Sequence, residues 1–296
     1  MSTTLAQAAG IAVIVFAASS MATVGLSYRI RRILRPLRGP RAVFRVLISN
    51  FVLVPLLAVG IEQIIPLDPP MALGLFLLAG SAGAPFLIKL ASAARRDLAL
   101  GASLLFLLVP LTVVFLPFYV PLALNHPSLA GLSYEPSSIV SIGLPLLSTM
   151  ILPVLLGLAV RAIWPSQASR LVRIGGKLAT IALIVVVAAT FVANLPGLIL
   201  VAKSGALAAA VLLIVGAFAS GYLLGRRGRS AVLGLGTAQR NIAGAMVVAS
   251  QDFSDPLILV MVTATSLVGL AVLFPIAWFL GRRAPELGPP TPRTRR

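Results

Sequence analysis

The chain has 296 residues, of which 59% are hydrophobic and only 10% are charged, and it carries a formal net charge of +17. A soluble domain carries roughly 25% charged residues, so this composition excludes a water-exposed globular protein and predicts an all-α integral membrane protein. The absence of cysteine excludes disulfides and thiolate metal sites, and a single histidine, His126, excludes a histidine-rich metal centre. No cofactor is expected.

Nine apolar stretches are long enough to cross the hydrocarbon core of a bilayer, which takes about 20 residues. They occupy residues 5–27, 44–66, 70–93, 98–124, 137–160, 172–195, 198–224, 229–250 and 256–281. The start of the chain has no basic segment, so we expect the first stretch, within residues 1–27, to be a retained helix rather than a cleaved signal. The tail, 282–296, is rich in proline and charge and is expected to be disordered.

The basic residues divide the connections between stretches into two alternating sets. Of the 24 lysines and arginines, 21 lie in clusters within residues 29–45, 95–96, 161–177, 226–229 and 282–296. Because positively charged loops stay in the cytoplasm, this alternation predicts an outside N-terminus, a cytoplasmic C-terminus and an odd number of helices. The high usage of alanine, leucine and arginine suggests a GC-rich bacterium and hence an inner membrane. Charge confined to short loops argues against nucleic-acid binding. The basic loop 28–43 is either an orientation signal alone or also a contact for anionic lipids.

The third stretch contains residues that interrupt a helix. Gly80 and Gly83 weaken it and Pro85 removes a backbone donor, so we predict a break near the middle of the membrane. Lys89 follows this break by about 9 Å of helical rise. Two interpretations of Lys89 remain open: its side chain reaches the cytoplasmic interface, or it faces a bound solute.

The eighth stretch contains the strongest polar cluster of any stretch. The cluster consists of Thr237, Gln239, Arg240 and Asn241. Gly234 and Gly236 precede it, and we expect them to break the helix. Arg240 lies roughly 15 Å from either end of the stretch, which is too far for its permanent charge to reach water easily. It is either a structural arginine satisfied by backbone carbonyls or part of a solute or ion site, and we favour the site.

The two interrupted stretches occupy corresponding places in the chain. One is the middle of three stretches within 44–124, the other is the middle of three within 198–281, and the predicted topology makes them run in opposite directions. This arrangement is typical of an inverted-repeat transporter, whose site lies where the breaks meet. Half-helix N-termini at such breaks favour a small organic anion. The residues expected to bind it are Arg240, Asn241, Gln239, Thr237 and Lys89.

Four segments also carry a family resemblance. They are Gly83, the run Ala94-Arg95-Arg96-Asp97-Leu98-Ala99-Leu100, the run Gly221-Tyr222-Leu223-Leu224-Gly225 and the crossing segment Gln239-Arg240-Asn241. From about Ser20 to Arg283 the chain resembles the bile acid:sodium symporter family. The resemblance implies a secondary transporter with a core of two three-helix units, 44–124 and 198–281, and two crossed broken helices. The helices in 1–27 and 137–195 would form a panel domain, and the family's usual first helix would be missing.

The chain departs from what the resemblance implies for sodium binding. Sodium-dependent members have a glutamate four residues before the crossing glutamine, where this chain has Leu235. They have a Ser-Asn pair in the first crossing helix and hydroxyls on the next one. Here those positions are Leu87 and Ile88, and then apolar residues such as Leu105 and Val109. If sodium binds, Gln239 and Thr237 would hold it, but a site without a carboxylate suits a hard cation poorly.

These departures suggest a different mechanism. We hypothesise that Lys89 and Arg240 replace sodium as tethered cations and bind an anionic substrate directly. Transport would then be uniport, exchange or proton-linked, with Lys89 as the titratable group. A receptor or scaffold without transport activity remains an alternative. An enzyme is not expected, because no His, Cys, Asp or Glu lies in the middle of a stretch.

Overall fold

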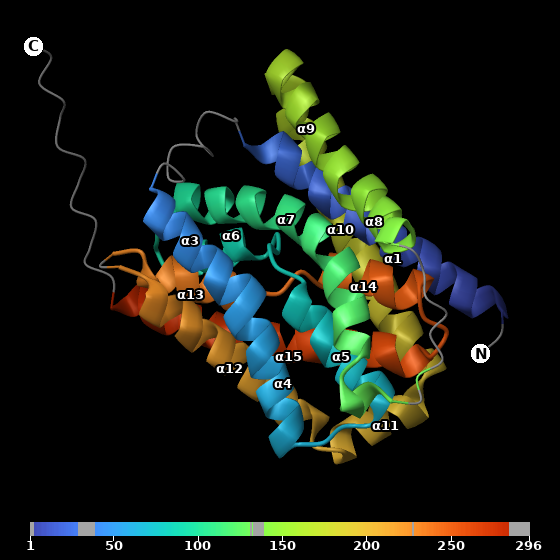
Figure 1. Cartoon of the computed structure of the whole chain (residues 1–296). Coiled ribbons are helices and arrows are strands. Elements are labelled where there is room, and N and C mark those ends of the chain that lie inside the picture. Colours follow the sequence, from blue (N-terminus) through green and yellow to red (C-terminus); the bar gives the residue numbers. More distant parts are fainter. Residues whose placement is uncertain (1–2, 29–38, 131, 133–138, 227, 284–296) are drawn as a thin grey trace, which may run out of the picture.

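The computed structural model describes residues 3–28, 39–130, 132, 139–226 and 228–283, which form helices joined by short turns (Figure 1). The predicted all-α membrane fold is confirmed for these residues. The arginines between 29 and 38, Glu135 and the tail from residue 284 lie outside them. In chain order the helices are α1 (Thr3–Ser27), α3 (Pro40–Ile48), α4 (Val54–Ile64), α5 (Pro69–Gly80), α6 (Leu87–Ala93), α7 (Leu98–Leu124), α8 (Ile139–Leu146), α9 (Leu152–Ile163), α10 (Pro165–Ala193), α11 (Leu195–Lys203), α12 (Ala206–Leu224), α13 (Ser230–Ala238), α14 (Ile242–Gln251) and α15 (Pro256–Arg282).

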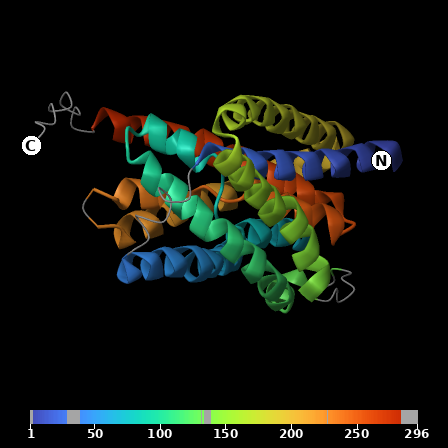
Figure 2. The ribbon, with the colours of Figure 1, turned by 90° about the horizontal axis from the view of Figure 1, so that it is seen from above.

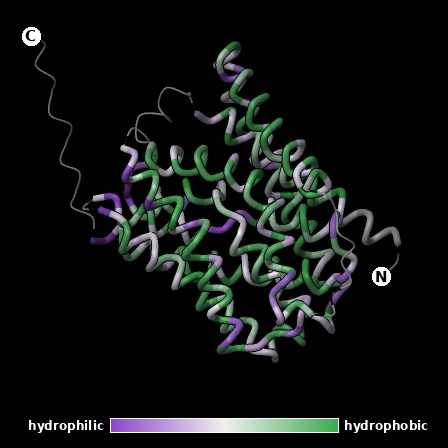
Figure 3. Tube along the Cα trace, viewed as in Figure 1, coloured by the Kyte–Doolittle hydropathy of each residue, from purple (hydrophilic) through white to green (hydrophobic). Residues whose placement is uncertain are grey.

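Two pairs of these helices continue through a π-helical segment, so that each pair is one long helix. Ser49–Leu53 joins α3 to α4, and Leu147–Ile151 joins α8 to α9. With these joined, seven helices in the described part of the chain are long and apolar enough to cross a membrane. Apolar residues dominate along them, and hydrophilic residues gather near many of their ends (Figure 3).

The third and eighth predicted stretches are not continuous helices. Each is a pair of short helices, α5 with α6 and α13 with α14. The count of nine spans therefore stays a prediction that depends on each pair crossing the membrane together.

Two predicted boundaries are wrong. The predicted basic loop between the fifth and sixth stretches is helical, because α9 ends at Ile163 and α10 begins at Pro165. Arg170 and Arg173 lie exposed on α10, where water solvates charge on a helix as well as on a loop. The seventh stretch is divided into α11 and α12 at Gly205, whose φ of 78° interrupts the helix.

One group of helices is built around α1, which packs along both α9 and α10. Figures 1 and 2 show these three helices together on one side of the molecule. The approach of α1 to α9 is close, because a side chain at Gly25 would overlap the backbone of Val154 and one at Gly157 would overlap that of Ala22. This group comprises the helices predicted to form the panel domain.

The other group surrounds α5. Every residue of α5 from Met71 to Gly80 is buried, and α5 contacts α4, α7, α14 and α15. A helix that is apolar on all sides belongs in the interior of a protein. The end of α5 therefore delivers the first helix break, beginning at the buried Ser81, to the centre of the molecule.

Candidate functional site

The two interrupted helix pairs meet at their breaks. Residues 81–86 connect α5 to α6, and residues 239–241 connect α13 to α14. The backbone N–H of Asn241 donates to the carbonyl oxygen of Ser81 at 2.9 Å, and its side-chain Nδ2 donates to that of Ala82 at 3.4 Å. The two breaks are thus joined by hydrogen bonds inside the protein, which satisfy part of the backbone that each break leaves without helical partners.

Helix α7 holds the first break in place. Thr112 accepts a hydrogen bond from the backbone N–H of Ala82 through Oγ1 and donates one to the carbonyl oxygen of the same residue, both at 2.9 Å. Next in the chain, Gly83 has a φ of 82°, and a Cβ there would lie 2.8 Å from the backbone nitrogen of Val109. Both the conformation and the space therefore require glycine at this position.

The glycines expected to break the helices have two different roles. Gly80 is the last residue of α5, and Gly83 and Pro85 lie in the connection that follows it. Gly234 and Gly236 lie inside α13, so the prediction that they break the helix is wrong. They allow close packing instead: a Cβ at Gly234 would lie 3.0 Å from Phe218, and one at Gly236 would lie 3.1 Å from Leu104.

The guanidinium group of Arg240 is enclosed by protein oxygens, and the residue is only 3% exposed. Nε donates to the carbonyl oxygen of Leu78 at 3.0 Å. Nη1 donates to Oδ1 of Asn50 and to the carbonyl oxygen of Thr237, both at 3.0 Å. Nη2 donates to the carbonyl oxygens of Ala79 at 2.5 Å and of Asn50 at 3.4 Å. We call these oxygens of Leu78, Ala79, Asn50 and Thr237 the oxygen cage.

The oxygen cage uses every donor that Arg240 has, since a guanidinium group carries five N–H groups. The arrangement matches the structural alternative, in which carbonyl groups satisfy the arginine. A direct contact between this guanidinium group and a substrate requires a different conformation. No carboxylate takes part in the cage. The positive charge is balanced instead by the carbonyl ends of α5 and α13, both of which face it with the negative ends of their dipoles.

A buried polar network supports the cage from the side of α4. Asn50 lies in the π-helical segment, donates through Nδ2 to the carbonyl oxygen of Val46 at 2.9 Å and donates to Oγ1 of Thr237 at 3.2 Å. Ser49 lies 3.4 Å from the same hydroxyl. Sequence reasoning missed Asn50 and Thr112. The pair Ser49-Asn50 within an apolar stretch was the available signal, because a polar side chain at that depth needs a partner.

Two other predicted residues lie in the second break. Asn241 is fully buried, and its Oδ1 caps α14 by accepting from the backbone N–H of Gly244 at 3.2 Å. Gln239 is buried, and its Oε1 has no hydrogen-bond partner among the described residues. Such an orphaned oxygen is costly and is often kept for a functional reason.

Lys89 lies apart from the cage, in a crevice between the two groups of helices. The crevice has a volume of about 310 Å³ and is lined by α1, α10 and the segment from Pro85 to Lys89. Ser20, Thr23 and Ser27 line the α1 side. The hydroxyls of Thr23 and Ser27 donate within α1, to the carbonyl oxygens of Ser19 at 2.7 Å and of Thr23 at 2.6 Å. We call this space the Lys89 crevice.

Lys89 is the charged residue among those that line the crevice. It is exposed, and its Nζ lies 5.0 Å from the centre of the Phe86 ring, where the aromatic face attracts a cation. Tyr28 lines the mouth, just beyond the end of α1, and burial raises its pKa, so its phenol stays protonated and can donate a hydrogen bond. An ammonium group without a hydrogen bond to the described residues, the Tyr28 phenol and the apolar walls together suit a small anion that also has an apolar part.

Comparison with known families gives one match. A family model described as the Sodium Bile acid symporter family matches residues 13–201. The matched segment includes α1 from residue 13 onward, the first interrupted pair and Lys89. It ends before α12 and does not include the second interrupted pair. No curated protein matches the chain.

Proposed function

This chain belongs to the sodium bile acid symporter family, and on that premise we propose that it is a secondary transporter that carries a small organic anion without a bound sodium ion. The observation that carries the proposal is the guanidinium group of Arg240 inside the oxygen cage.

The oxygen cage is a cation site that already holds a cation. Two helix C-termini and the side-chain oxygen of Asn50 converge on one point, an arrangement that stabilises positive charge. Arg240 supplies this charge covalently, so the site needs no ion from solution. A hard cation would also find no carboxylate there, because the position four residues before Gln239 is Leu235, which is fully buried.

The Lys89 crevice is the substrate site in this proposal. Its volume is at the lower end of the range for small-molecule pockets, which favours a small carboxylate over a steroid. The one ammonium group favours a single negative charge. The polar residues at the point where the two breaks meet then hold the breaks together and do not contact the substrate. They are Gln239, Asn241, Thr237 and Arg240.

Alternating access would follow from the position of the crevice. Its walls belong to different groups of helices, α1 and α10 on one side and α6 on the other. A movement of one group against the other would change the distance between Lys89 and the hydroxyls of α1. Substrate bound between them would then be exposed to one side of the membrane at a time.

The test is uptake of radiolabelled anions by proteoliposomes that contain the purified protein. The panel includes small carboxylates and one steroid carboxylate, and each is assayed with sodium or with choline at the same membrane potential. We expect uptake of a small carboxylate to differ less than twofold between the two cations. Uptake that requires sodium would overturn the proposal, and binding detected by thermal shift without any flux would indicate a receptor.

Variants of Lys89 test the substrate site separately. Removal of the charge in Lys89→Gln is expected to lower uptake at least tenfold, while Lys89→Arg retains most of it. The unfolding temperature should change little, because the exposed ammonium group forms no hydrogen bond with the described residues and its contact with the Phe86 ring contributes only about 0.5–1 kcal/mol. Lys203→Gln is the matched control, since Lys203 is exposed on α11 outside the crevice. Uptake by Lys89→Gln equal to that by the control would exclude the crevice.

A further inference from the structure

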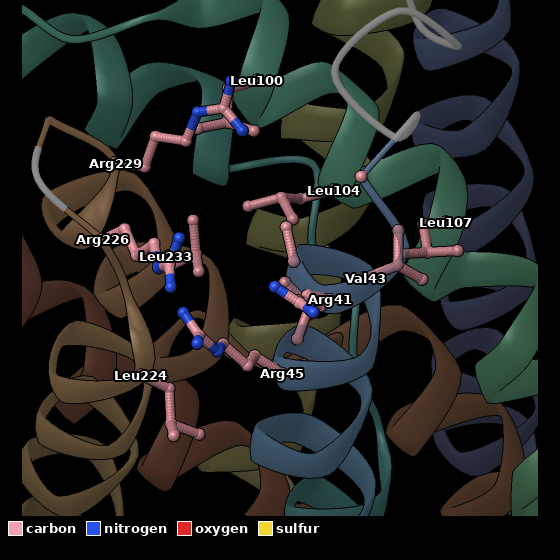
Figure 4. Close-up of a pocket in the computed structure, with 13 residues that line it drawn as sticks. Arg41, Val43, Arg45, Leu100, Leu104, Leu107, Leu224, Arg226, Arg229 and Leu233 are labelled. Carbon is pink, nitrogen blue, oxygen red and sulfur yellow. The ribbon is translucent and has the colours of Figure 1, made fainter.

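A second pocket lies at the helix ends where the basic clusters gather. Four arginines surround it: Arg41 and Arg45 on α3, and Arg226 and Arg229 in the turn between α12 and α13 (Figure 4). Its volume is about 240 Å³. We call it the four-arginine pocket; neither the oxygen cage nor the Lys89 crevice shares a residue with it.

The charge in this pocket is not balanced by the protein. Among the residues that the structure describes, no Asp or Glu lines the pocket. No described residue of any kind accepts a hydrogen bond from the side chains of the four arginines. Guanidinium groups are always charged, so four of them around one small space repel one another. An anion held between them would remove this repulsion and would join α3 to the turn before α13.

Backbone groups add to the attraction for an anion. Helices α3 and α13 both begin at the pocket, with Gly39 and Arg229 as their N-cap residues, and neither has a side-chain hydrogen bond at its N-cap. The N–H groups in the first turn of α13 lack partners within that helix and carry the positive end of its dipole. Helix α3 offers fewer donors, because its first residue, Pro40, has no N–H and the N–H of Ala42 donates to the carbonyl oxygen of Gly39 at 2.9 Å. Side-chain charge and backbone polarity therefore have the same sign here.

The floor of the pocket is apolar. Leu104 and Leu233 are buried beneath the arginines, and Leu100 and Leu107 extend this surface along α7 (Figure 4). Leu107 and Leu224 are partly exposed, so an acyl chain would bury apolar area against them, whereas a free inorganic anion would gain nothing from these side chains. An amphiphile with a phosphate head and an apolar tail complements both parts.

We infer that the four-arginine pocket binds the phosphate headgroup of one anionic phospholipid from the surrounding leaflet. The chain offers the phosphate four guanidinium groups, a match that favours bidentate hydrogen bonds. The location agrees, because basic clusters at the ends of membrane helices lie in the cytoplasmic leaflet, where anionic lipids attract them. The bound lipid would fix α3 against α13. Arg45 precedes the cage residue Asn50 by five residues and Arg229 precedes Thr237 by eight, or about one and a half and two helical turns.

The test is native mass spectrometry of the purified full-length protein in a neutral maltoside detergent. Phosphatidylglycerol and phosphatidylcholine with the same acyl chains are titrated separately. We expect one phosphatidylglycerol to bind preferentially and to raise the unfolding temperature. The double variant Arg226→Gln/Arg229→Gln should bind it about thirtyfold more weakly. The variant Arg226→Lys/Arg229→Lys keeps the positive charge, and its affinity for phosphatidylglycerol should fall less than that of the glutamine variant.

The control is Arg170→Gln/Arg173→Gln, which removes the same charge from an exposed face of α10 outside the pocket. An equal loss of lipid binding in the control would mean that only net charge matters and would overturn the inference, as would unchanged binding in the pocket variant. Glycerol 3-phosphate is tested as a competitor. If it binds at micromolar concentration and displaces the lipid, the pocket serves a soluble phosphate and the lipid assignment is wrong.

Discussion

The two interrupted helix pairs have the same plan but contribute opposite chemistry. The break after α5 contains no charged residue and presents carbonyl oxygens, those of Leu78 and Ala79 to Arg240 and those of Ser81 and Ala82 to Asn241. The break after α13 presents the donors. A helix that ends inside a membrane leaves its last carbonyls without partners. Neither pair can therefore satisfy its own polar groups, and the hydrogen bonds at the breaks form only when both pairs are present.

This difference shows that a permanent charge at membrane depth can serve as a structural donor. Arg240 satisfies five acceptor positions at once, which no neutral side chain can do. Lys89, beside the other break, forms no hydrogen bond with the described residues and faces an open crevice. The two cations thus have separate roles: Arg240 joins the two breaks, and Lys89 is available to a ligand. Variants of the residues at the two breaks test that separation.

The largest expected effect is that of Arg240→Ala. Removal of the guanidinium group leaves the cage oxygens buried without donors, and we expect a loss of about 4 kcal/mol in the free energy of unfolding. Thermal unfolding in detergent, followed by tryptophan fluorescence, measures it. Arg173→Ala is the matched control, because Arg173 is exposed on α10, and it should unfold as the natural chain does.

Chemical rescue makes this prediction specific to the cage. Millimolar methylguanidinium should raise the unfolding temperature of Arg240→Ala and leave that of the natural chain unchanged, because only the variant has an empty cage. Sodium chloride at the same concentration should not do so. If sodium restores stability and methylguanidinium does not, the oxygens are arranged for a metal ion, and the division between donor and acceptor breaks is wrong.

A smaller effect is expected from Gly83→Ala in the first break. The alanine must adopt a φ near 82°, and its Cβ would lie 2.8 Å from the backbone nitrogen of Val109. Strain and overlap together should cost about 3 kcal/mol of stability. Gly60→Ala, where a Cβ would meet nothing within 4 Å, controls for the loss of a glycine and should be neutral or slightly stabilising. Equal stability of the two variants would show that the first break is not rigid.

The helices could be predicted closely from the sequence because the bilayer selects composition. The stretch predicted at 98–124 is α7, and the one predicted at 256–281 differs from α15 by one residue. Composition is less informative beyond the bilayer, where charged residues suit a helix and a loop equally. That is why the predicted basic loop containing Arg170 is part of α10.

The composition of the candidate site was less predictable. Arg240 and Asn241 could be singled out because they are polar at membrane depth, but their partners could not. Asn50 lies 190 positions before Arg240, and the Leu78 and Ala79 carbonyls carry no sequence signal at all. Gly234 and Gly236 misled the prediction because glycine serves helix packing in membranes as often as it ends a helix.

The acidic residues that follow the two interrupted pairs differ as the breaks do. Asp97 comes before α7, and its Oδ1 accepts hydrogen bonds from the backbone N–H groups of Ala99 and Leu100. Asp252 follows α14 and is half-buried, and its Oδ2 has no partner among the described residues. Desolvation raises the pKa of Asp252 from 3.8 to about 6. The first carboxylate caps a helix, whereas the second is held where its charged form is disfavoured.

The smallest expected effect is therefore a pH-dependent one at Asp252. The folded protein keeps the Asp252 proton to a higher pH than the unfolded chain does. Stability from this group is thus fully present below pH 3.8 and is lost as the pH rises through about 6. Because the side chain is half exposed, solvent screening limits the loss to roughly 1 kcal/mol. Asp252→Asn should accordingly unfold a few degrees above the natural chain at pH 7.5 and together with it at pH 4. If the Asp252→Asn offset is the same at both pH values, the carboxylate is solvated by water in the turn, and the contrast with Asp97 lies only in their hydrogen bonds.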